Sequence, residues 1–222
     1  MKKIMLAAVF ISALALSARA QDFRFGLTAS PVFDWTRVEG SLFEGTGTKV
    51  GFQYGLLFDK TIGSVERYAF SSGILINYAS SGVSYTDTIT DIKSSWNASV
   101  QYIEIPLTMR LRTNEVNYIT YYGQFGLTPG ICIKARGNMV IDDVTVYDDV
   151  NLRDDANVTL ATYNLLNISL TLGAGAEYSL SENTSIMGGV FFQNGFANII
   201  KDDVDDNGST LKQIGIRLGV LF

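Results

Sequence analysis

The sequence predicts an all-β fold: an eight-stranded antiparallel up-and-down transmembrane β-barrel with short periplasmic turns and long external loops. Three observations predict it, namely the length of the extended segments, the alternation of apolar and polar residues along them, and the lengths of the links between them. A tilted strand needs about 9 to 11 residues to cross a bilayer, whereas strands of soluble domains commonly have about five or six. The predicted segments are long enough to cross, and they run from Phe23 to Asp34, Val50 to Lys60, Arg67 to Ala79, Val100 to Arg112, Tyr118 to Gly130, Leu166 to Leu180, Thr184 to Phe196 and Lys212 to Phe222.

The alternation is clearest in the segment QYIEIPLTMRLR, Gln101 to Arg112. Its aliphatic side chains share one face of an extended strand with Met109, while Glu104 and Arg110 lie on the other face. The last segment repeats the pattern, because apolar residues stand at every second position and Arg217 lies opposite them. In a transmembrane barrel the apolar face meets lipid and the polar face lines the interior.

The links between the segments alternate in length. The odd-numbered links are long, and the even-numbered links are tight turns with the sequences TIGSVE, TNEVN and SEN. This asymmetry is typical of outer-membrane barrels, in which closure of the first strand against the last leaves no open edge in the lipid. A soluble secreted β-sandwich is the alternative fold, but it gives no reason for every long loop to lie at one end. Aromatic residues near the segment ends fit interfacial girdles, and they are Tyr68, Tyr78, Tyr118, Tyr178, Phe196 and Phe222.

The first 20 residues have the pattern of a secretory signal peptide. Lys2 and Lys3 precede an apolar stretch that is shorter than the roughly 20 residues of a membrane-spanning helix, and small residues around Arg19 mark a cleavage site. We therefore expect residues 1–20 to be removed and residues 21–222 to form the barrel domain, with an uncleaved amino-terminal anchor as the alternative. The expected location is the outer membrane of a Gram-negative bacterium.

Five charged residues fall on faces that we assign to the barrel interior. Eight strands leave an interior that side chains fill, so a general porin is not expected. Because isolated buried charges are costly, we expect these five to pair in a structural ion network, with Arg217 facing a carboxylate. A proton or ion path along them is the alternative reading. The five are Arg24, Glu104, Arg110, Glu177 and Arg217.

The residue composition limits the chemistry that the chain can perform. Histidine is absent, and no Ser or Cys nucleophile has another plausible base, so we expect no enzymatic activity and assign no catalytic residues. The net charge of −5 argues against a nucleic-acid partner, which would require a basic face. Cys132 is the single cysteine, which excludes an internal disulfide.

The third and fourth long links are rich in aspartate. Asp203, Asp205 and Asn207, followed by Gly208, match the first half of a calcium-binding loop. The match then fails, because the twelfth position is Ile214 rather than Glu. We expect no resident cofactor; a weakly loop-bound Ca²⁺ is one reading, and a solvated loop that divalent cations bridge to anionic lipopolysaccharide is the other.

Several stretches resemble a known family. YIEIPLTMRLR resembles the fourth-strand signature, roughly Tyr-aliphatic-Glu-aliphatic-Pro, of small outer-membrane β-barrel proteins of Bacteroidetes-type bacteria, often called PorT-like. YYGQFGLTPGICIKAR, LGAGAEYSLSENTSIMGGVFFQNGFANI and IGIRLGVLF are similar to later strands of that family.

The predicted barrel, its acidic loops and the resemblance together lead us to expect certain partners and two classes of function. The partners are outer-membrane lipid, lipopolysaccharide and, during insertion, the barrel assembly machinery, for which the terminal aromatic Phe222 resembles an assembly signal. One class is a structural or surface-interaction barrel with long acidic loops. The other is an accessory component of a protein secretion apparatus, in contact with other envelope proteins.

Overall fold

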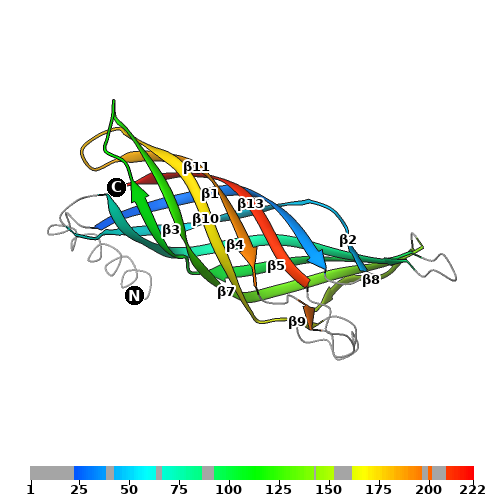
Figure 1. Cartoon of the computed structure of the whole chain (residues 1–222). Helices are drawn as coiled ribbons and strands as arrows, with labels where there is room; N and C mark the ends of the chain where they lie inside the picture. The colour runs from blue at the N-terminus through cyan, green and yellow to red at the C-terminus, as the bar shows by residue number, and fades with distance from the viewer. Residues whose placement is uncertain are drawn as a thin grey trace, which may run out of the picture.

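The computed structural model describes residues 23–38, 43–63, 67–86, 93–142, 144–152, 162–196, 200–201 and 209–222. The predicted signal peptide and the Asp203 loop lie outside these residues. The described residues form β-strands joined by turns (Figure 1). No helix in the described ranges is long and apolar enough to cross a membrane. The strands are β1 (Phe23–Val38), β2 (Phe43–Gly45), β3 (Lys49–Thr61), β4 (Tyr68–Thr86), β5 (Lys93–Glu104), β6 (Leu107–Arg112), β7 (Ile119–Ile141), β8 (Val144–Asn151), β9 (Thr162–Tyr163), β10 (Leu166–Ser179), β11 (Ser185–Gly195), β12 (Ile200–Lys201) and β13 (Ser209–Leu221).

Eight antiparallel strands close into a ring, which confirms the predicted fold class. Around the ring, β1 is followed by β3, β4, the combined β5 and β6, β7, β10, β11 and β13, and β13 pairs again with β1. The closing pair runs from Gly26 opposite Leu221 to Val38 opposite Ser209. Beyond it, Phe25 N donates to Phe222 O at 2.8 Å and Phe222 N donates to Phe25 O at 2.7 Å. Closure therefore gives each ring strand two neighbours, as a bilayer requires.

The strands β5 and β6 are two parts of one barrel strand. The sequence predicted a single segment from Val100 to Arg112, and Pro106 interrupts it because proline has no backbone N–H to donate to the ladder. The register continues unchanged across this point, since Glu104 pairs with Leu75 and Thr108 with Ser71. Ile105 N still donates to Pro129 O at 2.9 Å, so the wall stays closed.

Three strands run well past their predicted ends. We expected loops after Ala79 and Gly130, but β4 continues to Thr86, β5 begins at Lys93 and β7 continues to Ile141, where β8 pairs with it. The added stretches of β4 and β5 are rich in Ser and other small or polar residues, and that of β7 contains Lys134 and Arg136, so none of them continues the regular alternation that marked the membrane segments. Water can solvate both faces outside the bilayer, and backbone pairing alone does not require an apolar face there.

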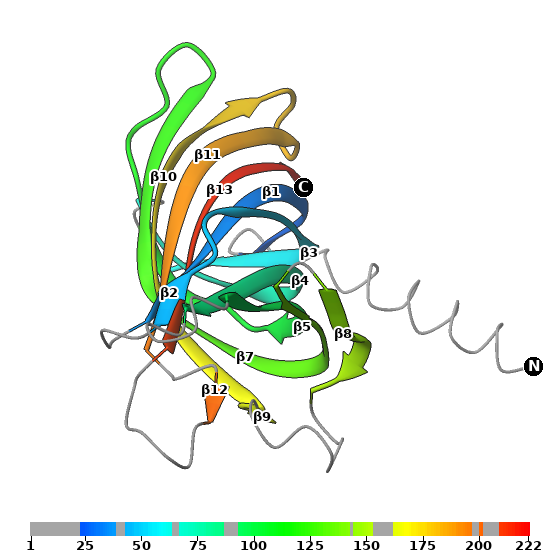
Figure 2. The same cartoon turned by 90° about the vertical axis from the view of Figure 1, so that its right-hand side faces the viewer.

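These paired ends form an external extension beyond one part of the barrel. The extension consists of β2, the external ends of β4, β5 and β7, and β8, and it projects away from the end that carries the C terminus (Figures 1 and 2). Its boundaries are set where pairings change. The β1–β3 ladder ends at Asp34 opposite Lys49. Beyond this point β1 keeps its ladder with β13, and β2 pairs with β4. Similarly, β7 leaves β10 beyond Ile131 and pairs with β8 from Arg136.

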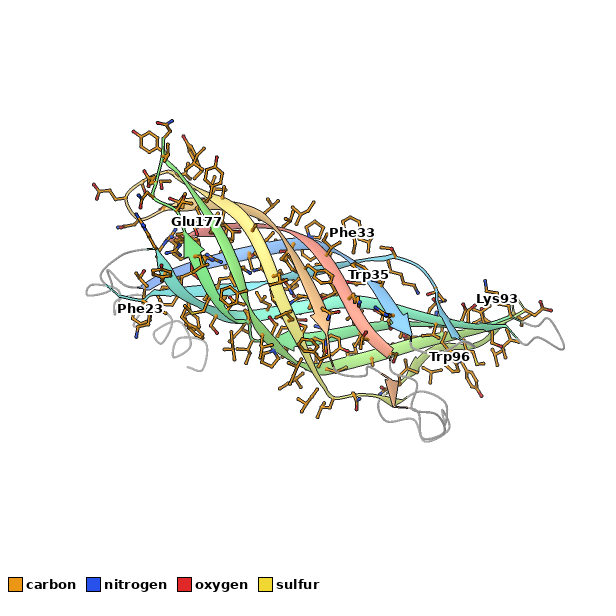
Figure 3. All side chains as sticks on the ribbon, viewed as in Figure 1. Phe23, Phe33, Trp35, Lys93, Trp96 and Glu177 are labelled. Atoms are coloured by element: carbon orange, nitrogen blue, oxygen red, sulfur yellow. The ribbon has the colours of Figure 1, made fainter. Side chains whose placement is uncertain are left out.

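Burial follows the alternation that the sequence predicted. In β13 the side chains of Gln213 and Arg217 are 3% and 4% exposed, whereas Ile216 and Leu218 are 46% and 56% exposed. An apolar surface of this extent would be a liability in water, but it matches the lipid-facing band of a membrane barrel. Aromatic residues gather toward its external edge, where Trp35 stacks on Phe192, and Figure 3 shows Phe33 and Trp35 there, far from Glu177.

Interior glycines make room for large side chains. Tyr122 points inward from β7, and a Cβ added to Gly189 would lie 2.7 Å from its hydroxyl oxygen and 2.6 Å from the carbonyl oxygen of Ala174. The adjacent Gly188 faces outward, and its nearest neighbour would be a Leu218 methyl carbon at 3.9 Å. The narrow interior therefore restricts Gly189 but not Gly188.

We predict opposite outcomes for alanine at these two adjacent glycines. Gly189→Ala should lower the free energy of unfolding by about 1–3 kcal/mol, because the added methyl group overpacks the interior. Gly188→Ala should be neutral or slightly stabilising, since glycine is the more flexible residue in the unfolded chain. Urea unfolding of the refolded barrel in detergent measures both, and equal effects would contradict the packing argument.

Candidate functional site: the polar interior of the barrel

An ion cluster occupies the interior near the short turns. Arg24 Nη1 and Glu177 Oε2 are 2.7 Å apart, and Arg110 Nη1 lies 2.6 Å from Asp59 Oδ2 and 3.3 Å from Glu177 Oε1. Arg112 Nη2 is also 2.6 Å from Asp59 Oδ2. The strands β1, β3, β6 and β10 supply these groups, and the register places Arg24 opposite Asp59. Three guanidinium groups thus share two carboxylates.

Arg110 is the most enclosed member of the ion cluster. Its side chain is 0% exposed, it donates to Gln124 Oε1 at 3.2 Å, and its guanidinium lies 4.7 Å from the centroid of the Tyr122 ring. Carboxylates on two sides and an aromatic face on a third replace the water that the charge has lost. The two inner glycines Gly175 and Gly189 leave the space that this ring needs.

A second network, built on Glu104, occupies the middle of the barrel. The carboxylate of Glu104 accepts hydrogen bonds from Asn77 Nδ2 at 2.7 Å, Gln53 Nε2 at 2.9 Å and Gln193 Nε2 at 3.3 Å. Among the described residues no Lys or Arg nitrogen lies within 4.0 Å of it. Side-chain amides from three strands therefore solvate this buried carboxylate.

The partner expected for Arg217 is corrected by the structure. We predicted a carboxylate, but Arg217 Nη2 donates to Gln53 Oε1 at 3.2 Å, and its guanidinium lies 4.4 Å from the centroid of the Phe191 ring. Gln53 donates in turn to Glu104 and so links the two charges through its amide. The Gln53 amide therefore bridges Glu104 and Arg217, which do not contact each other directly.

The hydrogen bonds continue toward the external end. Asn77 Nδ2 also donates to Gln213 Oε1 at 2.9 Å, and Gln213 Nε2 donates to Asp34 Oδ1 at 2.6 Å. The backbone N–H of Ser80 donates to the other oxygen of Asp34 at 2.9 Å. Arg217, Gln53, Glu104, Asn77, Gln213 and Asp34 thus form one continuous chain of hydrogen bonds.

An apolar cluster closes the interior beyond this chain. Tyr102 and Cys132 are each 1% exposed and pack with Leu152. Leu152 follows β8, and its backbone N–H donates to Ala135 O of β7 at 3.1 Å. Leu152 fits because β7 carries Gly137 at this point, where an added Cβ would lie 2.7 Å from a Leu152 methyl carbon. The remaining members are Ala79, Ala98, Val100, Ala135 and Leu211.

The structure places all five predicted interior charges inside the barrel, but sequence reasoning missed three others. Asp34 and Arg112 stand at alternate positions from Arg24 and Arg110, so the alternation contained the signal for both. Asp59 was harder to recognise, because Leu57 on the same face is also buried and blurs the polar pattern of β3. With these three included, the two networks contain four arginines, Arg24, Arg110, Arg112 and Arg217, and four carboxylates, Asp34, Asp59, Glu104 and Glu177. Lys49 is a further cation on the inner face of β3 near the external end, where it donates to Ser81 O at 3.4 Å and to Asn97 Oδ1.

The predictions of a calcium-binding loop and of an assembly signal stay predictions. Asp203, Asp205 and Asn207 lie outside the described residues, and within those residues no group of three His, Cys, Asp or Glu side chains could hold a metal ion. Phe222 faces outward with 49% of its surface exposed and pairs with Phe25 through the backbone. Its role as an assembly signal stays a prediction.

The closed ring, its apolar outer band and its hydrogen-bonded polar interior define an integral β-barrel of the outer membrane. A family model described as outer membrane protein beta-barrel domain matches residues 6–222. The chain belongs to the outer membrane protein beta-barrel domain family. The comparison with curated proteins gave no match.

Solved structures of similar outline include three bacterial outer-membrane proteins. Neisserial surface protein A matches with 9% identity and a TM-score of 0.44 over 90% of this chain and 95% of that one. OprG from Pseudomonas aeruginosa matches with 9% identity and a TM-score of 0.43 over 90% and 96%. The outer membrane protease OmpT from Escherichia coli matches with 7% identity and a TM-score of 0.41 over 91% and 96%. Similarity this low carries no argument about binding or activity.

We predict that the ion cluster stabilises the barrel. Glu177→Ala leaves Arg24, Arg110 and Arg112 with Asp59 as their remaining carboxylate, and it should lower the free energy of unfolding by about 3 kcal/mol or more. The matched control is Asp149→Ala, which breaks the exposed contact with Arg136 and should cost less than about 1 kcal/mol. Urea unfolding followed by tryptophan fluorescence compares the two, and similar small changes would remove the argument.

Proposed function

We propose that the protein is a non-catalytic integral barrel of the Gram-negative outer membrane with a structural or surface-interaction role. The observation that carries this proposal is the contrast between an interior filled by side chains and a long external extension. A barrel that served mainly as a pore would need an open interior, whereas this one is occupied by side chains along its length. The surface available for function is therefore the outside of the extension and the loops.

The extension supports a role in contacts at the cell surface. Its strand β8 is exposed along most of its length, and Val144, Val146 and Tyr147 are 65%, 48% and 42% exposed. Tyr147 stacks on Trp96 of β5, and their ring centroids are 6.4 Å apart. Aspartates flank these residues in the third long link, and divalent cations that bridge such acidic segments to lipopolysaccharide are part of the proposal.

The absence of histidine from the sequence supports a non-catalytic role. Export through a cleaved signal peptide at residues 1–20 and insertion by the barrel assembly machinery, with Phe222 as its signal, complete the proposal. No cofactor is required for it.

We predict that the purified protein behaves as a sealed barrel. It should fractionate with the outer membrane, migrate differently in denaturing gels with and without heating, and give no steady ion conductance in planar bilayers. Recovery from the aqueous fraction would contradict the location, and a stable open-channel conductance would contradict the sealed interior. The Glu177→Ala variant serves as a control that tests whether loosening the ion cluster opens a leak.

An accessory role in protein secretion is the second candidate. The segment YIEIPLTMRLR, which contains Glu104 and Pro106, supports it through its resemblance to PorT-like proteins of Bacteroidetes-type bacteria. The protein should then copurify with inner-membrane or periplasmic partners after gentle detergent extraction. Extraction as an isolated barrel would favour the first proposal.

A further inference from the structure

We infer that the external ends of β1 and β13 form a binding site for the phosphorylated headgroup of an outer-leaflet glycolipid, the chemistry of lipopolysaccharide. The inference rests on the proposed outer-membrane location and assigns a lipid contact to particular residues. The observation behind it is the juxtaposition of two outward cations, an aromatic pair and a hollow at the external edge of the lipid-facing band.

The two cations are adjacent, and neither forms an ion pair with a residue that the structure describes. Lys212 stands opposite Trp35 in the register of β1 and β13, and Arg37 stands two residues farther along β1, opposite Thr210. Both side chains belong to the outward-facing set of their strands, and Arg37 is exposed. Within the described part of the chain no carboxylate lies within 4.0 Å of either charge. Like charges placed side by side repel, and an anionic ligand between them would relieve this.

The level of these cations matches that of a lipid phosphate. Immediately toward the membrane lie Phe33, Ile214 and Phe192, and the ring of Trp35, level with Lys212, stacks on Phe192 with the centroids 6.1 Å apart. Aromatic girdles mark the boundary between the hydrocarbon region and the headgroups. Arg37 and Lys212 are thus placed just outside that boundary, where an arginine can bind a phosphate through two hydrogen bonds.

A hollow beside Trp35 supplies room for the sugar part of the headgroup. It has a volume of about 510 Å³ and is lined by Trp35, Thr36, Gly45, Gly47 and Thr48. It lies where the wall divides, because β1 loses β3 as a partner beyond Asp34 while β2 pairs with β4. The ring of Trp35 and the hydroxyl group of the exposed Thr48 are a suitable surface for a sugar.

Other outward cations do not reproduce this combination. Lys134 and Arg136 lie on β7, whose outward residues toward the membrane are Ile131 and Ile133 rather than aromatic rings. Arg136 is already in contact with Asp149. Lys134 therefore provides a matched control, as an exposed outward cation on a different part of the barrel.

The test uses the refolded full barrel in detergent and the fluorescence of Trp35. The chain has two tryptophans, so Trp96→Phe leaves Trp35 as the single reporter. In this background, titration with micelles that contain diphosphoryl lipid A should change the Trp35 emission in a saturable way. Arg37→Ser combined with Lys212→Ser should weaken the apparent affinity about tenfold or more, because the phosphate loses its charge-assisted hydrogen bonds. Lys134→Ser should leave the affinity unchanged.

Four outcomes would overturn the site. They are no response of the parent protein, an equal loss with Lys134→Ser, an unchanged affinity of the double variant, and an equal response to fully dephosphorylated lipid A. Saturation by inorganic phosphate alone would show a free-anion site and overturn the lipid source. Heat-dependent gel mobility verifies the fold of each variant, and the single variants Arg37→Gln and Lys212→Gln replace the double variant if it does not refold. Because the barrel is already folded in detergent, a negative result rejects the site without bearing on the outer-membrane location.

Discussion

The rest of this structure depends on the closure of the β-ladder between the first and last ring strands. A lipid bilayer offers no hydrogen-bond partner to a free strand edge, so β1 must pair with β13 as well as with β3. Closure with eight strands sets a narrow interior, which explains why glycines line it where Tyr122 and Phe191 project inward. The same narrowness brings charged residues from distant strands into contact, as in the pairing of Arg24 with Glu177.

The interior resolves the cost of buried charge in two physically different ways. Near the short turns, Asp59 and Glu177 contact arginines directly, and the attraction between opposite charges compensates for lost hydration. In the middle, the carboxylate of Glu104 contacts three side-chain amides, and Gln53 connects it to Arg217. Neutral amides hold a charge in place without requiring a second charge at close range. The two networks together fill the barrel with polar groups whose geometry is specified from several strands at once.

Alternation and link length were sufficient to predict the eight strands, the inward and outward faces, and the interior position of all five charges first assigned there. The sequence predicted one strand from Val100 to Arg112, and the unchanged register across Pro106 agrees with that, but it did not reveal that Pro106 interrupts the backbone ladder within this strand. It also did not reveal the external extension, whose residues lose the membrane pattern while keeping backbone pairs. Among the interior charges, Asp34 and Arg112 followed the alternation, but Asp59 was hidden by the buried Leu57. Which charges touch, as opposed to which face inward, depends on strand stagger, and this cannot be read from one strand at a time.

The uneven external end follows from the same requirement for paired edges. Inside the bilayer every ring strand needs two partners, but beyond it water can solvate a free edge, so the wall is able to divide. It divides after Asp34 and after Ile131, and each division releases strand ends to form new pairs, β2 with β4 and β8 with β7. The apolar cluster around Tyr102 and Leu152 fills the interior at the level where the extension begins. The shorter side of the wall, where β1 and β13 end, carries Trp35, Arg37 and Lys212 at the external edge of the outward apolar band, so the two sides of one barrel differ in what they present beyond that band.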